Sequence, residues 1–167
     1  VLGAEVWTLD YKDGELAVND EVKLQVARVL RQARPKTIIT HWKGSMHKDH
    51  TAAHEMLSDA RFYGGIQAFD LGGEPTWASH VYYGENWEDL RGFVPEVFLK
   101  LEPEDMEVYE RAMRCYALFR GEVSPFPYLD YYKAQIRARG CETMQGLACA
   151  FAVPPEQHRR RAESLVG

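Results

Sequence analysis

The chain has 167 residues, 46% hydrophobic side chains, a formal net charge of −5 and a pI near 5.7. This length and composition can build a sizeable core, so we expect residues 1–167 to form a single domain. The acidic balance lacks the positive charge that binding to a phosphate backbone requires, which argues against nucleic-acid partners. There is no apolar run of membrane-spanning length and no signal-peptide pattern, so a cytoplasmic protein is the default expectation.

The beginning of the chain predicts a strand followed by a helix. Residues 1–10 form a strand-like run without an initiator Met or a polar lead-in, so we expect a chain cut from a longer one. Apolar residues at helical spacing then predict an amphipathic helix over 22–33. Asn19 or Asp20 can cap its first turn, and Arg31 lies outside its apolar face.

The segment 41–50 has the composition of a reactive site. It follows a short β-branched run, 36–40, that predicts a buried strand, and it leads into a predicted helix over 49–63. Polar groups between the carboxyl end of a strand and the start of a helix lie in the crevice where open α/β sheets bind ligands. Asp49 can cap this helix, because its carboxylate accepts from exposed backbone amides. The candidate side chains of the segment are His41, His47, Asp49 and His50.

The alternation of strands and helices across residues 4–63 predicts an α/β fold with a mostly parallel sheet flanked by helices. Later segments continue the pattern. They predict strands at 80–83 and 96–101, helices from Pro103 and over 128–138, and a last strand or a covering loop at 148–153.

Two other polar features have structural rather than catalytic interpretations. The acidic, aromatic segment 85–90 is interpreted as a solvated loop, although its acids and its aromatic ring would also suit a sugar site. The cysteines are odd in number and form no C-x-x-C pair, which argues against a disulfide framework and a cysteine zinc site. We expect partly buried thiols at Cys115, Cys141 and Cys149.

The histidines of the segment suit metal chemistry. Neutral imidazoles bind Zn²⁺, and a catalytic zinc typically takes three protein ligands and a water molecule. His47 and His50 do not supply three ligands by themselves. His54, four residues after His50, could share a helical face with it and form a rival pair, although no Glu follows His50 as in H-E-x-x-H. Contact of His54 or His41 with a metal is left open.

Three sequence elements, in this order, resemble the LmbE-like, PIG-L-type zinc-dependent de-N-acetylases. They are Y-K-D-G-E-L at 11–16, I-I-T at 38–40 and H-K-D-H at 47–50. The H-x-D-H element is the specific part. Later landmarks at 81–83, 95–98 and 148–151 extend the resemblance over nearly the whole chain.

The resemblance implies a Rossmann-like α/β fold and one zinc ion that activates water to cleave an acetamide, commonly on an N-acetylglucosaminyl group. By position, His50 matches the zinc-binding histidine of the family. His47 matches the histidine that stabilises the tetrahedral oxyanion and protonates the leaving amine. Asp49 would orient His47, and Asp13 matches a loop position associated with binding the sugar hydroxyls.

The chain departs from the family pattern at three places. Lys48 replaces the usual Pro, and it would either add positive charge at the pocket edge or simply be solvated. Cys149 stands where the family has the acid of A-E-x-F. The early H-P-D-D element, which supplies two zinc ligands and the general base, is absent. We therefore expect a chain that lacks the first strand and helix of the fold, takes its remaining zinc ligands from a missing N-terminal segment, and is inactive alone.

Three functions remain in competition. The first is a zinc amidohydrolase that acts on a small amide-bearing sugar or sugar conjugate. The second is a zinc hydratase or lyase on the same scaffold, since zinc-activated water can attack other carbon centres. The third is a non-catalytic α/β domain that binds a sugar or a partner. An upstream H-x-D-D would favour either enzyme, and a homo-oligomer is left open.

Overall fold

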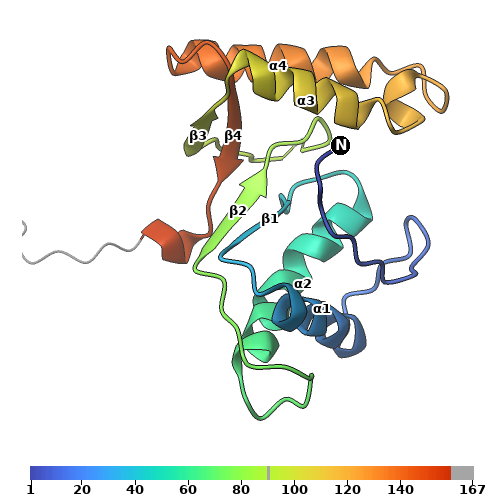
Figure 1. Ribbon diagram of the computed structural model, residues 1–167, viewed down its shortest axis with the longest axis vertical. Helices are drawn as coiled ribbons and strands as arrows, with labels where there is room; N and C mark the ends of the chain where they lie inside the picture. Colours follow the sequence, from blue (N-terminus) through green and yellow to red (C-terminus); the bar gives the residue numbers. More distant parts are fainter. Residues whose placement is uncertain (90, 159–167) are drawn as a thin grey trace, which may run out of the picture. The chain divides into compact units, whose positions relative to one another are not determined.

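The computed structural model describes residues 1–89 and 91–158 of the chain (Figure 1). The chain divides into two compact units. One contains residues 1–8 and 95–151, and the described part of the other contains residues 9–89, 91–94 and 152–158. The expected single domain stays a prediction. Within the described ranges, no helix combines the length and the apolar character needed to cross a membrane.

The larger unit combines a parallel strand pair with two long helices (Figure 1). Its elements are α1 (Asp20–Ala33), β1 (Thr37–His41), α2 (Lys48–Gly65), β2 (His80–Gly84) and the short 3₁₀ helix η2 (Pro155–His158). β1 and β2 run parallel, with Thr37 opposite His80 and His41 opposite Gly84. α1 packs against α2, and α2 packs against β1. This unit confirms the predicted alternation of helices and parallel strands after residue 19.

The start of α1 follows the predicted capping chemistry. Asn19 is the N-cap, and its Oδ1 accepts from the Val22 N–H at 2.9 Å. Val22 is fully buried and forms a core cluster with Ala52 and Met56 of α2. The apolar stripe of α1 is therefore the face that fixes this helix on the one carrying the candidate site.

Arg31 is the exception to the predicted polar face of α1, because its side chain is only 4% exposed. Its guanidinium donates to the carbonyl oxygens of Gly64 and Ile66, at 3.1 and 2.6 Å, and also reaches those of Tyr63 and Gly73. The last carbonyls of a helix lack intrahelical partners and carry partial negative charge. Arg31 thus satisfies the end of α2, which the hydrophobic pattern of α1 could not indicate.

The other unit contains an antiparallel strand pair with two helices. Its elements are β3 (Val97–Lys100), α3 (Pro103–Met113), the 3₁₀ helix η1 (Leu118–Arg120), α4 (Tyr128–Glu142) and residues 148–151 of β4 (Ala148–Ala152). β3 and β4 run antiparallel, with Val97 opposite Phe151 and Lys100 opposite Ala148. The open alternative at 148–153 is thereby resolved as a strand. The chain contains a parallel pair, β1 and β2, and an antiparallel pair, β3 and β4. The predicted mostly parallel sheet is therefore not fully parallel.

Two predictions outside the helices and strands are wrong. Residues 1–10 form no strand, and their apolar side chains Val6 and Trp7 are exposed, because an alternating run becomes a strand only where a neighbouring backbone pairs with it. Cys115 and Cys141 are exposed rather than partly buried, since they lie at or beyond helix ends that face solvent, whereas Cys149 in β4 is partly buried as expected.

Candidate functional site

The loop between β1 and α2 carries the candidate site. His41 is the last residue of β1, and α2 begins at Lys48, so residues 42–47 connect the carboxyl end of a parallel strand to a helix start. The Met46 N–H donates to the Glu88 carbonyl oxygen at 3.0 Å. This bond ties the loop to the segment that follows the neighbouring strand β2.

A second set of contacts fixes the same loop. The Trp42 indole N–H donates to the Arg91 carbonyl oxygen at 2.8 Å, and its ring meets Tyr83 and Phe93 edge-on. Gly44 is the point of closest approach, because a Cβ there would overlap the same Arg91 carbonyl oxygen. The loop is therefore held on both sides rather than only at its ends.

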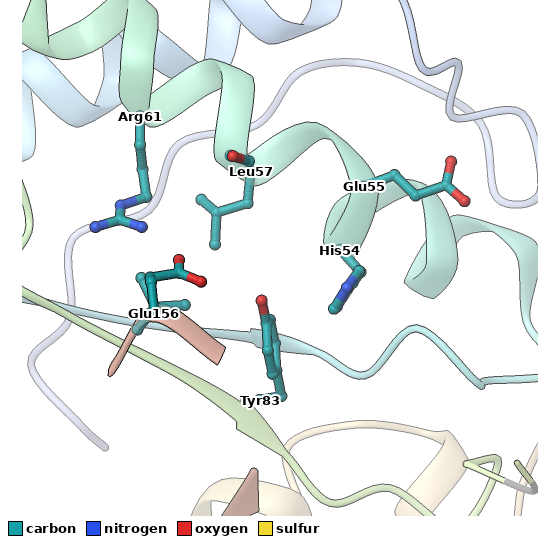
Figure 2. Close-up of a pocket in the computed structure, with 8 residues that line it drawn as sticks. His54, Glu55, Leu57, Arg61, Tyr83 and Glu156 are labelled. Atoms are coloured by element: carbon teal, nitrogen blue, oxygen red, sulfur yellow. The ribbon is translucent and has the colours of Figure 1, made fainter. Parts of the chain in front are cut away.

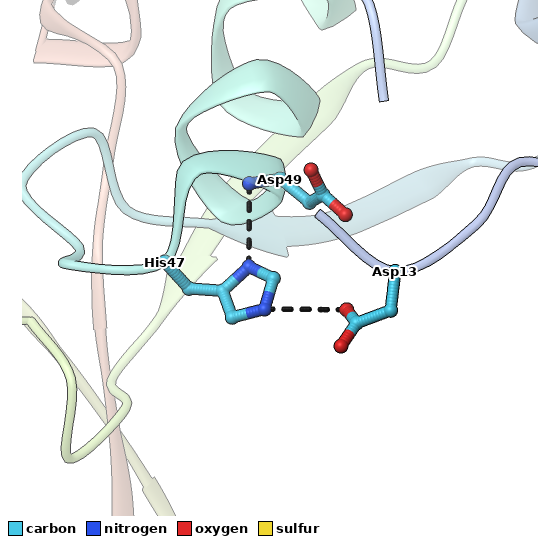
Figure 3. Close-up of side chains that lie close together, drawn as sticks. All are labelled: Asp13, His47 and Asp49. Atoms are coloured by element: carbon cyan, nitrogen blue, oxygen red, sulfur yellow. Dashed lines mark hydrogen bonds and ion pairs between the residues drawn. The ribbon is translucent and has the colours of Figure 1, made fainter. Parts of the chain in front are cut away.

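His47 is the N-cap of α2, and its Nδ1 accepts from the Asp49 N–H at 3.3 Å. The prediction that the Asp49 carboxylate caps this helix is therefore wrong, because the imidazole of His47 reaches the exposed amide first. The other ring nitrogen, Nε2, lies 3.3 Å from Asp13 Oδ1 (Figure 3). The ring is thus held between a backbone amide and a carboxylate.

The Asp49 carboxylate binds the backbone of an earlier loop. Its Oδ2 accepts from the Gly14 N–H at 2.6 Å and its Oδ1 from the Leu16 N–H at 3.2 Å. These bonds hold the turn that carries Asp13 next to His47. The contact between Asp49 and His47 runs through the backbone, so the orienting role expected of the carboxylate stays a prediction.

Asp13, His47 and Asp49 together form a group that could hold a cation. One ligand atom from each lies within 4.8 Å of the others (Figure 3). However, the Asp13 side chain is 92% exposed, and both Asp49 oxygens already accept backbone hydrogen bonds. Acidic groups of this kind also suit the binding of polar ligands, so the group alone does not identify a metal site.

His50 lies deeper and is surrounded by polar and aromatic groups. Its Nδ1 is 3.1 Å from Glu88 Oε2 and 3.1 Å from Ser45 Oγ. Its ring stacks on His41 with centroids 3.8 Å apart and nearly parallel planes, and its other neighbour is His47 at 4.7 Å. The structure therefore brings together the three predicted histidines of segment 41–50.

The surroundings favour neutral rings. Burial lowers the pKa of His50, although the Glu88 carboxylate opposes this shift. Burial, with repulsion from His50 and His47, lowers the pKa of His41 to about 4. Both rings are thus uncharged near pH 7, and the neutral imidazole is the form that binds a metal ion.

Glu88 is the site residue that the sequence interpretation missed. Segment 85–90 was expected to be solvated, yet the Glu88 side chain is only 14% exposed and its Oε2 is buried without a hydrogen bond. The prediction of a solvated loop is wrong at this residue because the loop folds back over the start of α2. The signal was available, since Glu88 follows β2 and the carboxyl ends of parallel strands meet at one edge.

His54 faces a separate cavity of about 310 Å³ between α2 and β2 (Figure 2). Its Nδ1 lies 3.0 Å from the His41 carbonyl oxygen, and its ring is 4.4 Å from that of Tyr83. Arg61, Glu156 and Glu55 line the same cavity, and in Figure 2 the Glu55 carboxylate is directed away from the other labelled side chains. The structure thus places His54 beside the strand end without bringing it into the His47–His50 pair.

The two remaining departures from the family pattern differ in position. Lys48 is exposed, and its aliphatic stem lies beside Gly14, which fits the solvated alternative. Cys149 belongs to the other compact unit. Its role stays open.

Sequence comparison supports the resemblance over the first part of the chain. A family model described as GlcNAc-PI de-N-acetylase, PIG-L, matches residues 1–61. This range contains all four predicted site residues, Asp13, His47, Asp49 and His50. The predicted resemblance is therefore confirmed over that range. No curated protein sequence matches the chain.

Solved structures share the fold. The conserved protein TT1542 from Thermus thermophilus is similar with a TM-score of 0.74 and 24% identity, and the match covers 87% of this chain and 64% of that one. GalB, the 4-carboxy-2-hydroxymuconate hydratase from Pseudomonas putida KT2440, gives a TM-score of 0.68 and 17% identity, with 90% and 63% covered. N,N'-diacetylchitobiose deacetylase from Pyrococcus horikoshii gives a TM-score of 0.67 and 15% identity, and the match covers 94% of this chain and 60% of that one.

These similarities confirm the predicted α/β fold class. At identities of 24% and below they establish the fold alone. The matched part of each solved structure is 60–64% of its length. Activity, substrate and partners of the whole protein are therefore matters for proposal.

Proposed function

We propose that the protein is a zinc-dependent hydrolase that removes an acyl group, an acetyl group in the simplest case, from an amide nitrogen of a sugar or sugar conjugate of N-acetylglucosaminyl type. The observation that carries this proposal is the side-by-side placement of His47 and His50, 4.7 Å apart, at the carboxyl end of a parallel strand. The PIG-L family model spans this segment, and one similar structure is a diacetylchitobiose deacetylase.

The donor chemistry at His50 fits a metal ion. The ring is neutral near pH 7, Nδ1 faces Glu88 and Ser45, and Nε2 has no hydrogen-bond partner among the described residues. Glu88 Oε2 is buried without a hydrogen bond, which suits an imidazole that gains positive character from a cation on its far nitrogen. We expect the remaining ligands from outside residues 1–167. When bound, Zn²⁺ would lower the pKa of a water molecule and polarise the acyl oxygen.

His47 is suited to donate a proton. Because its Nδ1 accepts the Asp49 N–H, the neutral ring carries its proton on Nε2, the nitrogen that points toward Asp13. In this proposal, Nε2–H stabilises the developing oxyanion. To protonate the leaving amine, the ring first takes up a second proton, the one that the attacking water releases, so that loss of the Nε2 proton leaves a neutral imidazole. A substrate hydroxyl bound by the exposed Asp13 carboxylate would bring the acyl group within reach of that proton.

Asp49 supports both groups. Its carboxylate holds the turn of Asp13, while its N–H fixes the ring of His47. We therefore propose that Asp49 positions His47 from the backbone side and the sugar-binding turn from the carboxylate side. We also propose that the enzyme is cytoplasmic and that its substrate is a small molecule.

The test uses the full-length protein supplied with Zn²⁺, and it measures metal content and acetate release. His50→Ala should abolish zinc retention. His47→Ala should keep zinc and lower turnover by roughly 10²- to 10⁴-fold, the scale of a general acid. His80→Ala, at the exposed first residue of β2, is the matched control and should change neither. Full zinc occupancy in His50→Ala, or unchanged turnover in His47→Ala, contradicts the assignment.

A second candidate is a zinc hydratase or lyase. It is favoured by one observation, the similarity to the GalB hydratase at a TM-score of 0.68. Zinc-activated water can add to an unsaturated acid as well as to an amide. Parallel assays with N-acetylglucosaminyl compounds and with unsaturated dicarboxylates separate the two activities. A protein that only binds these compounds without turnover would match the third, non-catalytic function.

A further inference from the structure

We infer that Glu88 is a positioning residue for the proposed metal site, because it fixes the tautomer of His50 and so presents Nε2 as the ligand atom. This inference rests on the proposed function for the identity of the ligand atom. It adds a residue from the segment after β2, which lies outside the H-x-D-H element and outside the range matched by the family model.

The position of the proton on His50 decides which ring nitrogen can bind a metal ion. A neutral imidazole has one N–H and one lone pair, and the partner of one nitrogen decides which atom carries the proton. Two groups compete for Nδ1, namely Glu88 Oε2 and Ser45 Oγ, both at 3.1 Å. An ionised carboxylate can only accept, so Glu88 requires the proton on Nδ1 and leaves the lone pair on Nε2.

Ser45 could stabilise the opposite tautomer of His50. The Ser45 hydroxyl can donate as well as accept, and its oxygen already accepts from the His47 N–H at 3.3 Å. Without Glu88, Ser45 could donate its hydrogen to Nδ1, and His50 would then carry its proton on Nε2. In that tautomer Nε2 has no lone pair for a metal ion.

The Glu88 carboxylate is held close to His50 and away from solvent. Its Oε2 is buried without a hydrogen bond, and its side chain is 14% exposed, so the carboxylate is kept out of water next to the imidazole. A buried carboxylate oxygen without a partner is costly. His50 Nδ1 lies 3.1 Å away, so a proton on that nitrogen would offset the cost by charge-assisted donation, which favours the Nδ1–H tautomer. The hydrogen bond from the Met46 N–H to the Glu88 carbonyl oxygen fixes the distance between the loop before α2 and the segment after β2.

The direct test is the tautomer of His50 in metal-free full-length protein, measured by long-range ¹H–¹⁵N NMR of the imidazole nitrogens. Wild type and Ser45→Ala should show the proton on Nδ1. Glu88→Ala should move a large part of the population to Nε2–H. A His50 spectrum in Glu88→Ala that matches wild type would overturn the inference, and it would do so without any bearing on catalysis.

The second readout is zinc affinity by competition with a chelator. Glu88→Ala should weaken binding by about 10- to 100-fold, the usual effect of removing the partner of a ligating histidine. Glu88→Gln keeps the size of the side chain and guards against misfolding, and it should show a smaller loss in the same direction. Glu55→Ala removes an exposed carboxylate from α2 as the matched control. Equal zinc affinities of Glu88→Ala, Glu88→Gln and Glu55→Ala would overturn the inference. If only His50→Ala lost zinc, the inference about Glu88 would fail while the proposed function would stand.

Discussion

The two hydrogen bonds from Asp49 to the Gly14 and Leu16 amides predict a measurable coupling between α2 and the turn that carries Asp13. Asp49→Asn keeps the shape of the side chain. One amide oxygen can still accept one N–H, but the NH₂ group then faces the other backbone donor. The substitution therefore removes at least one charge-assisted bond.

The size of the effect follows from that loss. A hydrogen bond to a charged group contributes about 1.5–3 kcal/mol, so opening of the turn should become about 10- to 150-fold more favourable. Amide hydrogen exchange reads this directly, since the Gly14 and Leu16 amides should lose protection by that factor while the amides in the middle of α2 keep theirs.

Asp59→Asn is the matched control for this prediction. Asp59 lies on the same helix, its side chain is 51% exposed, and its carboxylate pairs with Lys23. Its substitution should leave the Gly14 and Leu16 amides unchanged. If Asp49→Asn and Asp59→Asn gave the same protection at these two amides, the proposed anchoring of the Asp13 turn by Asp49 would be refuted.

Three further predictions concern stability. Arg31→Met should lower the free energy of unfolding, measured in urea, by about 3 kcal/mol, because it leaves helix-end carbonyls of α2 without donors. Arg28→Met, at an exposed position of the same helix, should change it by less than about 0.5 kcal/mol. Equal effects of the two substitutions would contradict the capping role of Arg31. Burial raises the folded pKa of Asp89 to about 6, above its ordinary value of 3.8, so the Asp89 contribution lowers the free energy of unfolding as pH rises from about 4 to about 6. The advantage of Asp89→Asn over wild type should therefore grow across that window by about 1–2 kcal/mol, and a difference independent of pH would refute the burial argument. Gly140→Ala should lower the free energy of unfolding by about 1–3 kcal/mol, because the added Cβ would overlap the backbone of Gly146. A variant as stable as wild type would contradict this, since the backbone at Gly146 would then move aside without cost.

The local sequence signals predicted the scaffold of the site well. Apolar periodicity located α1, and the expected strand and helix on either side of the histidine segment located β1 and α2. α1 and α2 then pack on one another through Val22, Ala52 and Met56. The strand-to-helix loop with its histidines was predicted for the same reason, since the carboxyl end of a parallel strand is where polar groups meet. These features depend on residues that lie close in sequence.

The contacts that sequence patterns missed are those between distant segments. Arg31 reaches the end of α2, and Glu88 reaches His50, across separations of more than thirty residues. Each looked like an ordinary surface charge, because hydropathy records the charge and not the partner that stabilises it after burial. The run at 1–10 failed for the converse reason, since strand propensity alone does not provide a neighbouring strand.

The central claim is metal-dependent deacylation at the His47–His50 pair, and acetate release from an N-acetylglucosaminyl compound by the full-length protein tests it most directly. We expect acetate and free amine to appear in equal amounts with Zn²⁺ present, to stop after removal of the metal by a chelator, and to return when Zn²⁺ is restored. The absence of acetate with Zn²⁺ bound, or release that continues at the same rate without metal, would contradict the claim.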